Sequence, residues 1–166
     1  KIVGFRHVLH DEPDDNFMLR QDFNAGIRAL GRYPLCYDLL IFEKHLPQTI
    51  QFADMHPGLS MVVDHIAKPV IRRSQFDHAW AANIRQLANR EHVCCKLSGM
   101  VTEVRDGAWD EQMLKPYFER AKLSLPVLEG KVVEVRGMLV VASCRGAAVG
   151  DLYRIQAETG EILAEV

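Results

Sequence analysis

The sequence has no excess of charge of either sign and no long apolar run. Its 166 residues carry 20 Lys and Arg against 22 Asp and Glu, for a formal net charge of −2. Basic residues scattered at this balance lack the electrostatic footprint of a nucleic-acid-binding protein. No apolar stretch reaches the roughly 18 residues of a membrane-spanning helix, and residues 1–10 lack the layout of a signal peptide. We therefore expect a cytoplasmic protein with no nucleic-acid or membrane partner.

The strong motifs of enzyme active sites are also missing. The sequence contains no HxH, HExxH, GxSxG, GxGxxG or GxxxxGK[ST] pattern, so the motifs typical of common metal, nucleophile and phosphate sites are absent. Four cysteines, at positions 36, 94, 95 and 144, form no CxxC spacing. They are too few for a disulfide scaffold, which favours buried thiols in a reducing compartment.

The length and the pattern of the chain indicate half of a barrel with an appendage. The first 121 residues alternate short apolar runs with helical patterns, which is typical of βα units and a parallel sheet. A complete (β/α)8 barrel needs about 250 residues, so we predict a partial barrel of about four units. The chain starts with Lys1 inside an apolar run, as if taken from something longer. We expect strands at 2–9, 35–42, 60–65 and 93–97, and helices at 17–30, 46–55, 76–90 and 109–121.

The pattern of apolar residues changes after about residue 122, where helical periodicity gives way to short β-rich runs between glycine-containing turns. Strands are expected at 131–135, 138–142, 151–156 and 162–166, forming an antiparallel β meander. The composition shift at Leu125-Pro126 predicts a domain boundary, with 1–121 as the partial barrel and 122–166 as a small β-rich segment.

Candidate site residues follow from position, because working groups in parallel α/β folds lie at the C-terminal ends of strands. Asp64-His65 ends the apolar run at 60–65, which we expect to be covered on both faces, and burying such a pair is costly unless it is satisfied or functional. His65 suits a metal ligand, a proton shuttle or a carbonyl polariser. The alternative is that Asp64 caps the next loop and His65 is structural. The other candidates by position are Arg6, His7, His10, Tyr37, Asp38, Lys68, Lys96 and Ser98.

Arg6 is a planar cation suited to holding a carboxylate or a polarised carbonyl, with a surface ion pair as the alternative that spacing alone favours. His7 and His10 are three residues apart, which on a strand places them on opposite faces and disfavours a two-histidine metal clamp. Adjacent Cys94 and Cys95 also face opposite ways, which is more typical of core than of ligands.

Several short motifs follow one another along the chain in an order that resembles a known family. Gly-Phe-Arg-His-Val-Leu at 4–9, Leu-Cys-Tyr-Asp-Leu-Leu at 35–40, His-Leu-Pro at 45–47, Val-Asp-His-Ile-Ala-Lys-Pro at 63–69 and Lys-Leu-Ser-Gly at 96–99 resemble the amidohydrolase-related lactonases, the fuconolactonase-like sugar-lactone and dicarboxylate-lactone hydrolases. The resemblance covers about 120 residues and makes the four units the third to sixth of the barrel.

The resemblance implies hydrolytic opening of a lactone, with Arg6 and His65 as catalytic residues. Arg6 would bind the substrate and His65 would bind or polarise the lactone carbonyl. Asp38, Asp64 and Lys68 would be substrate-binding residues. A divalent metal is compatible with this chemistry but not required by the sequence, and no residue is assigned as a metal ligand.

The resemblance also has gaps. The family places an HxH at the end of its first strand and a catalytic aspartate in a Gly-Ser-Asp-Trp-Pro-like segment, and this sequence contains neither. A missing general base removes about 10²–10⁴-fold in rate, so we expect the chain to be inactive as it stands. Asp64 matches the family's own strand-five aspartate and is not a substitute base.

The tail carries a second resemblance. Gly-Lys-Val-Val-Glu-Val-Arg-Gly-Met-Leu at 130–139, Gly-Ala-Ala-Val-Gly-Asp-Leu at 146–152 and Thr-Gly-Glu-Ile-Leu-Ala-Glu-Val at 159–166 are similar to the N-terminal β-barrel of flagellar and type III secretion export ATPases. That barrel packs subunits into rings, which implies an assembly or binding role as the alternative function. Two joined partial families also suggest a fused reading frame or a fragment. Unclosed sheet edges predict self-association.

Overall fold

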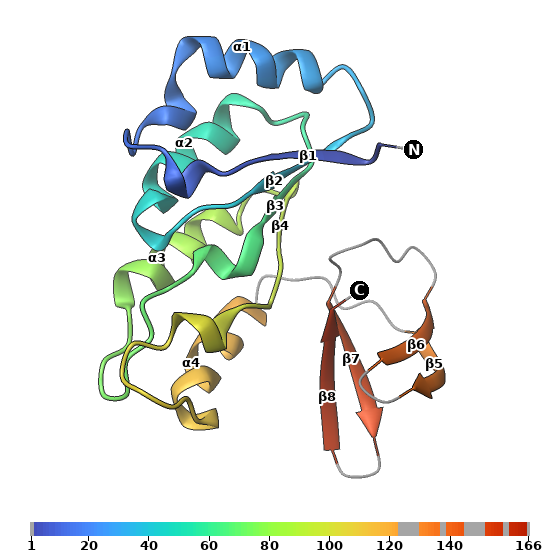
Figure 1. The fold of residues 1–166 in the computed structure, drawn as a ribbon. Helices are drawn as coiled ribbons and strands as arrows, with labels where there is room; N and C mark the ends of the chain where they lie inside the picture. The colour runs from blue at the N-terminus through green and yellow to red at the C-terminus, as the bar shows by residue number, and fades with distance from the viewer. Residues whose placement is uncertain (1, 123–129, 137–138, 145–151, 158–159, 166) are drawn as a thin grey trace. The chain divides into compact units, whose positions relative to one another are not determined.

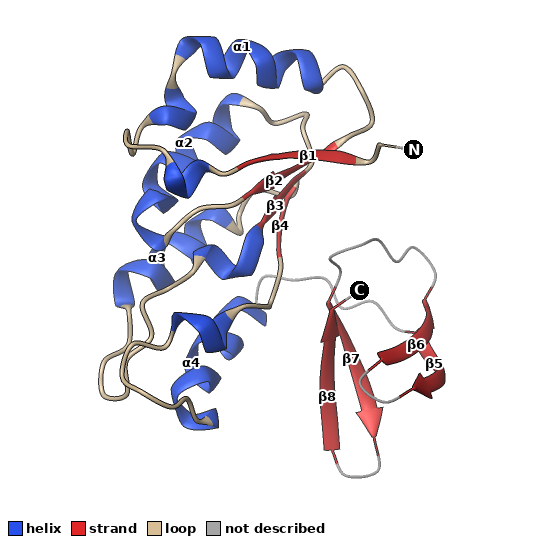
Figure 2. Cartoon of the chain, in the orientation of Figure 1, coloured by secondary structure: helices blue, strands red, loops and turns tan. Residues whose placement is uncertain are grey.

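The computed structural model describes residues 2–122, 130–136, 139–144, 152–157 and 160–165. The chain divides into two compact units, Lys1–Ser124 and Leu125–Val166. Figure 1 traces the chain, and Figure 2 separates its helices from its strands. Among the described residues, every helix is too short or too polar to cross a bilayer.

A four-stranded parallel sheet forms the centre of the first unit. Its strands are β1 (Gly4–His7), β2 (Cys36–Leu39), β3 (Met61–Val63) and β4 (Val93–Cys95), and their order in space is their order in the chain. All three neighbouring pairs are parallel. The prediction of a partial barrel built from four βα units is confirmed, and each strand is shorter than the run that predicted it.

Four helices connect or follow the strands: α1 (Gln21–Leu30), α2 (Leu46–Met55), α3 (His78–Leu87) and α4 (Glu111–Lys122). The bounds of α2 are those expected from Pro47 in its first turn. The single helix expected at 17–30 is wrong, because Arg20 is extended (φ −63°, ψ 144°) and separates a short 3-10 turn, η2 (Phe17–Leu19), from α1. The start of α3 is later than expected because the Asp77 carboxylate caps it, accepting from the Trp80 N–H at 2.8 Å.

The core lies between the sheet and the helices that Figure 2 shows to one side of it. Burial alternates along β2 and β3: Tyr37, Leu39, Met61 and Val63 are 0–3 % exposed, whereas Val62 is only half-buried. The expectation that β3 is covered on both faces is therefore wrong.

Side chains alternate between the two faces of the sheet, and the face opposite the core carries those that point the same way as Val62. In register with one another, these are Arg6, Asp38, Val62 and Cys94. Cys94 is exposed, so the expectation of buried thiols is wrong for this residue, while Cys36 and Cys95 are half-buried. The site residues on the strands therefore belong to the face away from the helical core.

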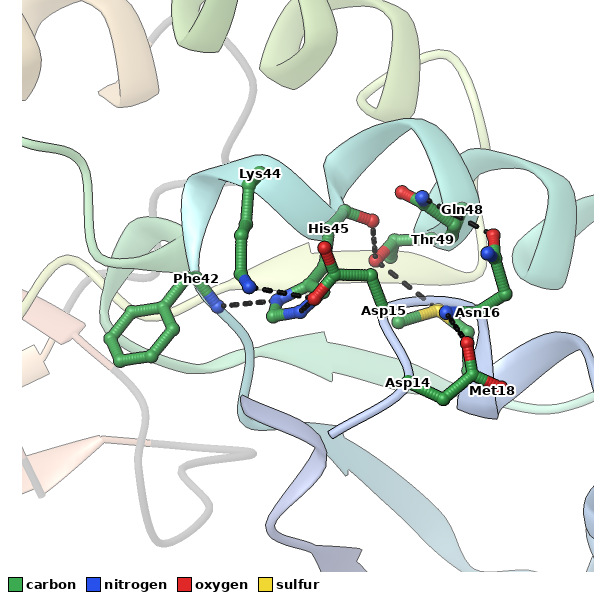
Figure 3. A network of polar contacts seen from close by, with 9 residues as sticks. All are labelled: Asp14, Asp15, Asn16, Met18, Phe42, Lys44, His45, Gln48 and Thr49. Carbon is green, nitrogen blue, oxygen red and sulfur yellow. Dashed lines mark hydrogen bonds and ion pairs between the residues drawn. The ribbon is translucent and has the colours of Figure 1, made fainter. Parts of the chain in front are cut away.

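A polar network anchors the loop after β1 to the start of α2 (Figure 3). The His45 ring is 1 % exposed, and its Nδ1 accepts from the backbone N–H of Phe42 at 3.1 Å. The ring proton is therefore on Nε2, which donates to Asp15 Oδ1 at 3.1 Å. Lys44 Nζ donates to the same oxygen at 2.6 Å. The loop is held in place by one carboxylate with two donors.

The second unit contains two antiparallel hairpins. β5 (Gly130–Arg136) pairs with β6 (Leu139–Cys144), and β7 (Leu152–Ala157) pairs with β8 (Gly160–Glu165), in two separate two-stranded sheets. Antiparallel strands in this part of the chain were expected, each within two residues of these bounds at its start. The resemblance to an export-ATPase barrel stays a prediction.

The buried side-chain amide of Asn24 allows a test of what stabilises the first unit. Asn24 is 1 % exposed; its Nδ2 donates to the carbonyls of Met18 and Arg20, both at 2.8 Å, and its Oδ1 lies 2.6 Å from His56 Nε2. Asn24→Ala leaves these buried groups unsatisfied, so we expect a loss of about 2–4 kcal/mol in the free energy of unfolding, measured by urea denaturation. The exposed Asn89→Ala serves as the control and should change it by less than about 0.5 kcal/mol. Equal effects of the two would contradict this account.

The hydrogen-bonded pair of Asn24 and His56 predicts that stability falls at acid pH. Burial, and then the charge of Arg28, lower the pKa of His56 below its ordinary value of 6.5. Just below pH 6.5 the unfolded chain takes up a proton that folded His56 does not, so the free energy of unfolding falls as the pH falls. His56→Gln removes this contribution, and we expect a shallower fall between pH about 7 and about 5 in urea titrations. An unchanged slope would contradict the buried neutral histidine.

Candidate active site

Each strand of the sheet contributes one charged residue near its C-terminal end. Arg6 on β1 is the register partner of Asp38 on β2. Asp64 directly follows β3 and Lys96 directly follows β4, after the register partners Val63 and Cys95. Because parallel strands end at the same edge, the four side chains meet there. We call Arg6, Asp38, Asp64 and Lys96 the charge network.

In the charge network each carboxylate contacts both cations. Arg6 Nη2 lies 2.7 Å from Asp38 Oδ2, and Arg6 Nε lies 2.8 Å from Asp64 Oδ2. Lys96 Nζ lies 2.9 Å from Asp64 Oδ1 and 3.3 Å from Asp38 Oδ2. The two positive and two negative charges cancel, so the network holds no net charge.

The four side chains of the charge network differ in burial, from fully buried to about half-exposed. The Asp64 side chain is fully buried, and the side chains of Lys96, Asp38 and Arg6 are 11 %, 25 % and 42 % exposed. Burial alone lowers the pKa of Lys96, but the ion pair with Asp64 at 2.9 Å, with the charge of Asp38, raises it above its ordinary value. Lys96 is therefore a fixed cation that neutralises Asp64. Arg6 and Asp38 are the members that solvent or a ligand reaches.

A left-handed turn directly follows Asp64. His65, Ile66, Ala67 and Lys68 have φ of 51°, 48°, 59° and 46°, a conformation that costs roughly 1–2 kcal/mol per residue in L-amino acids. Tertiary hydrogen bonds hold it: the Ile66 N–H donates to the Lys96 carbonyl at 3.0 Å, and Trp80 Nε1 donates to the Ile66 carbonyl at 2.7 Å. No glycine or asparagine in this segment signals the turn, so sequence reasoning missed it.

The turn brings His65 against the loop that follows β4. His65 Nδ1 lies 2.8 Å from Ser98 Oγ. Gly99 has φ +69°, and a Cβ there would lie 3.0 Å from the Cβ, Cγ and Nδ1 atoms of His65. The position accepts only glycine without displacement, which is a packing role that the sequence did not reveal. Ser98, a candidate by position, is a direct neighbour of the histidine.

Lys68 is directed elsewhere. Its Nζ lies 5.5 Å from the centroid of the Phe42 ring, a cation–π distance. His10 stacks on the same ring at 4.7 Å, and burial, followed by the charge of Lys68, lowers the pKa of His10. No ion pair joins Lys68 to Asp38 or Asp64 in the described part of the chain. Its predicted role as a substrate-binding residue stays a prediction.

The other candidates lie outside the network. His7 Nε2 lies 2.6 Å from Glu12 Oε1 and its ring stacks on Phe17 at 5.2 Å. His10 is in the 3-10 turn η1 (Leu9–Asp11) rather than on a strand, so the argument from opposite strand faces was wrong for this residue. Tyr37 is 3 % exposed in the core, and burial raises the pKa of its hydroxyl.

The described residues do not fit a metal centre: no group of three or more His, Cys, Asp and Glu among them is arranged to hold a metal ion. Both carboxylates of the charge network already face two cations. What the site offers instead is a partly exposed guanidinium, a partly exposed carboxylate and an imidazole. These are groups that bind a polarised carbonyl, a carboxylate and hydroxyls.

Residues 1–126 match the family model described as Amidohydrolase. The chain is 41 % identical over 108 residues to the L-fucono-1,5-lactonase of Burkholderia multivorans and 37 % identical over 103 residues to that of Burkholderia ambifaria. These matches cover 62 % of this chain and 36 % and 35 % of the two relatives. A zinc-bound crystal structure of a Burkholderia multivorans amidohydrolase is 35 % identical, with a TM-score of 0.67 over 74 % of this chain and 45 % of that one. The chain thus spans about a third of the curated relatives.

The buried carboxylate gives the sharpest test of the charge network. Asp64→Asn removes the buried one of the two carboxylates that Lys96 and Arg6 share, and breaking a buried pair in this way costs about 3–5 kcal/mol in the free energy of unfolding. The control is Asp54→Asn, which breaks the exposed pair with Arg90 at 2.8 Å and should cost at most about 1 kcal/mol. Urea denaturation measures both. The network has no structural importance if Asp64→Asn costs no more than Asp54→Asn.

Proposed function

Since the chain belongs to the amidohydrolase family, we propose that residues 1–121 supply the carbonyl-binding side of an active site that opens sugar lactones. The single observation behind this proposal is the arrangement at the strand ends, where partly exposed Arg6 is held by Asp64 and the imidazole of His65 follows in the next position. The names of the two curated relatives support the choice of a sugar 1,5-lactone as substrate class.

In the proposed reaction, water adds to the lactone carbonyl carbon and the ring C–O bond breaks. The carbonyl oxygen gains negative charge as water adds, and the ring oxygen takes a proton as it leaves. Cationic or N–H donors aimed at the carbonyl oxygen stabilise that charge. Arg6 and His65 are the proposed donors. The product is an open-chain hydroxy acid, whose carboxylate is a natural partner for the Arg6 guanidinium.

Asp38 is proposed to bind a sugar hydroxyl. Its Oδ2 faces Arg6 and Lys96, whereas Oδ1 makes no hydrogen bond to any described residue. The side chain is 25 % exposed, so this second oxygen is accessible to a hydroxyl donor. Asp64 is in a different position, because it is fully buried between two cations. Its proposed role is to orient Arg6 rather than to touch the substrate.

The general base is proposed to come from outside these residues. A base must lose its ion pairs to accept a proton, and Asp64 is held by both Arg6 and Lys96. The 166 residues lack the HxH and Gly-Ser-Asp-Trp-Pro-like segments of the resembling family. We therefore expect the chain to bind the lactone and its acid while opening the lactone at close to the uncatalysed rate.

Isothermal titration of the full chain with the open-chain acid of a six-carbon sugar 1,5-lactone tests the role of Arg6. Arg6→Lys keeps the charge but loses the planar fork, so the affinity should fall roughly tenfold, which corresponds to about 1.4 kcal/mol. The control is Arg85→Lys, because Arg85 is exposed on α3 and makes no hydrogen bond or ion pair with the described residues of the site. Equal affinity of Arg6→Lys and the unmodified chain would contradict the proposal.

A parallel assay of lactone opening tests the missing base. The chain should not accelerate the reaction by more than a few fold over buffer, because a missing base removes about 10²–10⁴-fold in rate. Rapid opening that survives in His65→Gln would show that the carbonyl is bound and attacked elsewhere.

A further inference from the structure

The two ring nitrogens of His65 have different surroundings. Nδ1 lies 2.8 Å from Ser98 Oγ. Nε2 has no hydrogen-bond partner among the described residues, and it is not among their buried unsatisfied atoms. The ring is half-buried, so Nε2 is the nitrogen that solvent or a ligand reaches. The chemistry of the site depends on whether this atom carries the proton.

The Ser98 hydroxyl decides the question. Its oxygen has one hydrogen-bond partner in the described part of the chain, which is Nδ1 of His65. A hydroxyl has one proton to donate, and here Nδ1 is the acceptor in reach. If Ser98 donates, the Nδ1 lone pair is occupied and the proton of the neutral ring is on Nε2. If Nδ1–H donated instead, the half-buried hydroxyl proton of Ser98 would have no protein acceptor.

The backbone on both sides fixes this contact. Gly99 has no Cβ, which would otherwise lie 3.0 Å from Nδ1, so the ring packs directly on the chain after Ser98. On the other side, the Ile66 N–H donates to the Lys96 carbonyl at 3.0 Å and ties the left-handed turn to the end of β4. The ring is held between two segments that are themselves joined.

We propose that Ser98 is a positioning residue that keeps His65 as its Nε2–H tautomer, so that His65 offers a hydrogen-bond donor to the substrate. Resting on the proposed function, the inference is that this donor binds the lactone carbonyl oxygen and that the proton stays on Nε2 while the carbonyl is polarised. An Nε2–H has no lone pair in the ring plane, so in this form His65 neither takes a proton nor ligates a metal through Nε2.

His45 in the same unit has a comparable arrangement, in which a donor occupies Nδ1. The Phe42 backbone N–H occupies Nδ1 of His45 at 3.1 Å, which leaves Nε2 as the donor to Asp15 (Figure 3). For His65 the donor is a side-chain hydroxyl, so a single substitution removes it without touching the backbone. That difference makes the inference testable.

The test is a long-range ¹H–¹⁵N correlation spectrum of the full ¹⁵N-labelled chain at pH about 8.5, where an ordinary imidazole is neutral. His65→Gln assigns the signals. In the unmodified chain we expect Nδ1 to resonate as a pyridine-type and Nε2 as a pyrrole-type nitrogen. Ser98→Ala should move both signals toward averaged values of a tautomer mixture, and Ser98→Thr, which keeps a hydroxyl, should restore the separation.

The matched control is Thr102→Ala. The Thr102 hydroxyl donates to the Gly99 carbonyl at 2.7 Å in the same loop and makes no hydrogen bond to His65. Its removal should leave the His65 signals unchanged. A pyrrole-type Nδ1 in the unmodified chain, or identical His65 signals in Ser98→Ala, would overturn the inference.

A binding measurement separates this inference from the proposed function. Ser98→Ala should weaken binding of the sugar lactone by roughly three- to tenfold, the range of one hydrogen bond, and weaken binding of its open-chain acid less. If the unmodified chain binds neither compound, the proposed function fails, while the spectrum still decides the tautomer. If Ser98→Ala mixes the tautomers but binds lactone as tightly as the unmodified chain, the proposed donor role of Nε2–H is overturned.

Discussion

The buried carboxylate of Asp64 is the constraint on which the rest of the site depends. A carboxylate with no solvent exposure is stable only when cations and donors replace its water. Arg6 comes from the first strand and Lys96 follows the fourth, so one side chain links the two edges of the sheet. Because Asp64 takes one guanidinium nitrogen and the ammonium, the exposed parts of Arg6 and Asp38 are held in fixed positions for a ligand.

The left-handed turn is the second half of the same arrangement. Four consecutive residues with positive φ would be unstable in isolation, and the turn persists because Ile66 is bonded to both Lys96 and Trp80. Lys96 therefore acts twice, with its ammonium on Asp64 and its carbonyl on the turn that begins at His65. After this turn the imidazole lies against Ser98 and Gly99, with Nε2 accessible. Strained backbone of this kind is concentrated at functional sites.

The sequence predicted the parts of the fold that depend on local patterns. Helix α2 was expected at its observed bounds because Pro47 opens it and residues 56–58 end it. Arg6, Asp64 and Lys96 were candidates because they lie at or after the ends of expected strands, and Asp38 because it lies within one. The parallel register brings the four together. The roles of these residues in catalysis stay predictions.

What the sequence could not predict depends on tertiary contacts. Which carboxylate pairs with which cation follows from strand order and register, which no single segment contains. The turn at 65–68 has no glycine to mark it, because its conformation is imposed by Lys96 and Trp80 from elsewhere in the chain. Gly99 is part of the Lys-Leu-Ser-Gly motif at 96–99, but its close approach to His65 is a tertiary contact that the motif itself does not specify. The extended Arg20 that interrupts the first helix also lacks a local marker.

The most direct test of this account is a crystal structure of the chain with the open-chain acid of a sugar 1,5-lactone bound. The account predicts the ligand carboxylate on the Arg6 guanidinium, with an oxygen in hydrogen-bond reach of His65 Nε2 and with Asp64 still paired to Arg6 and Lys96. A ligand bound away from Arg6 and His65, or an Asp64 carboxylate separated from Lys96, would contradict it.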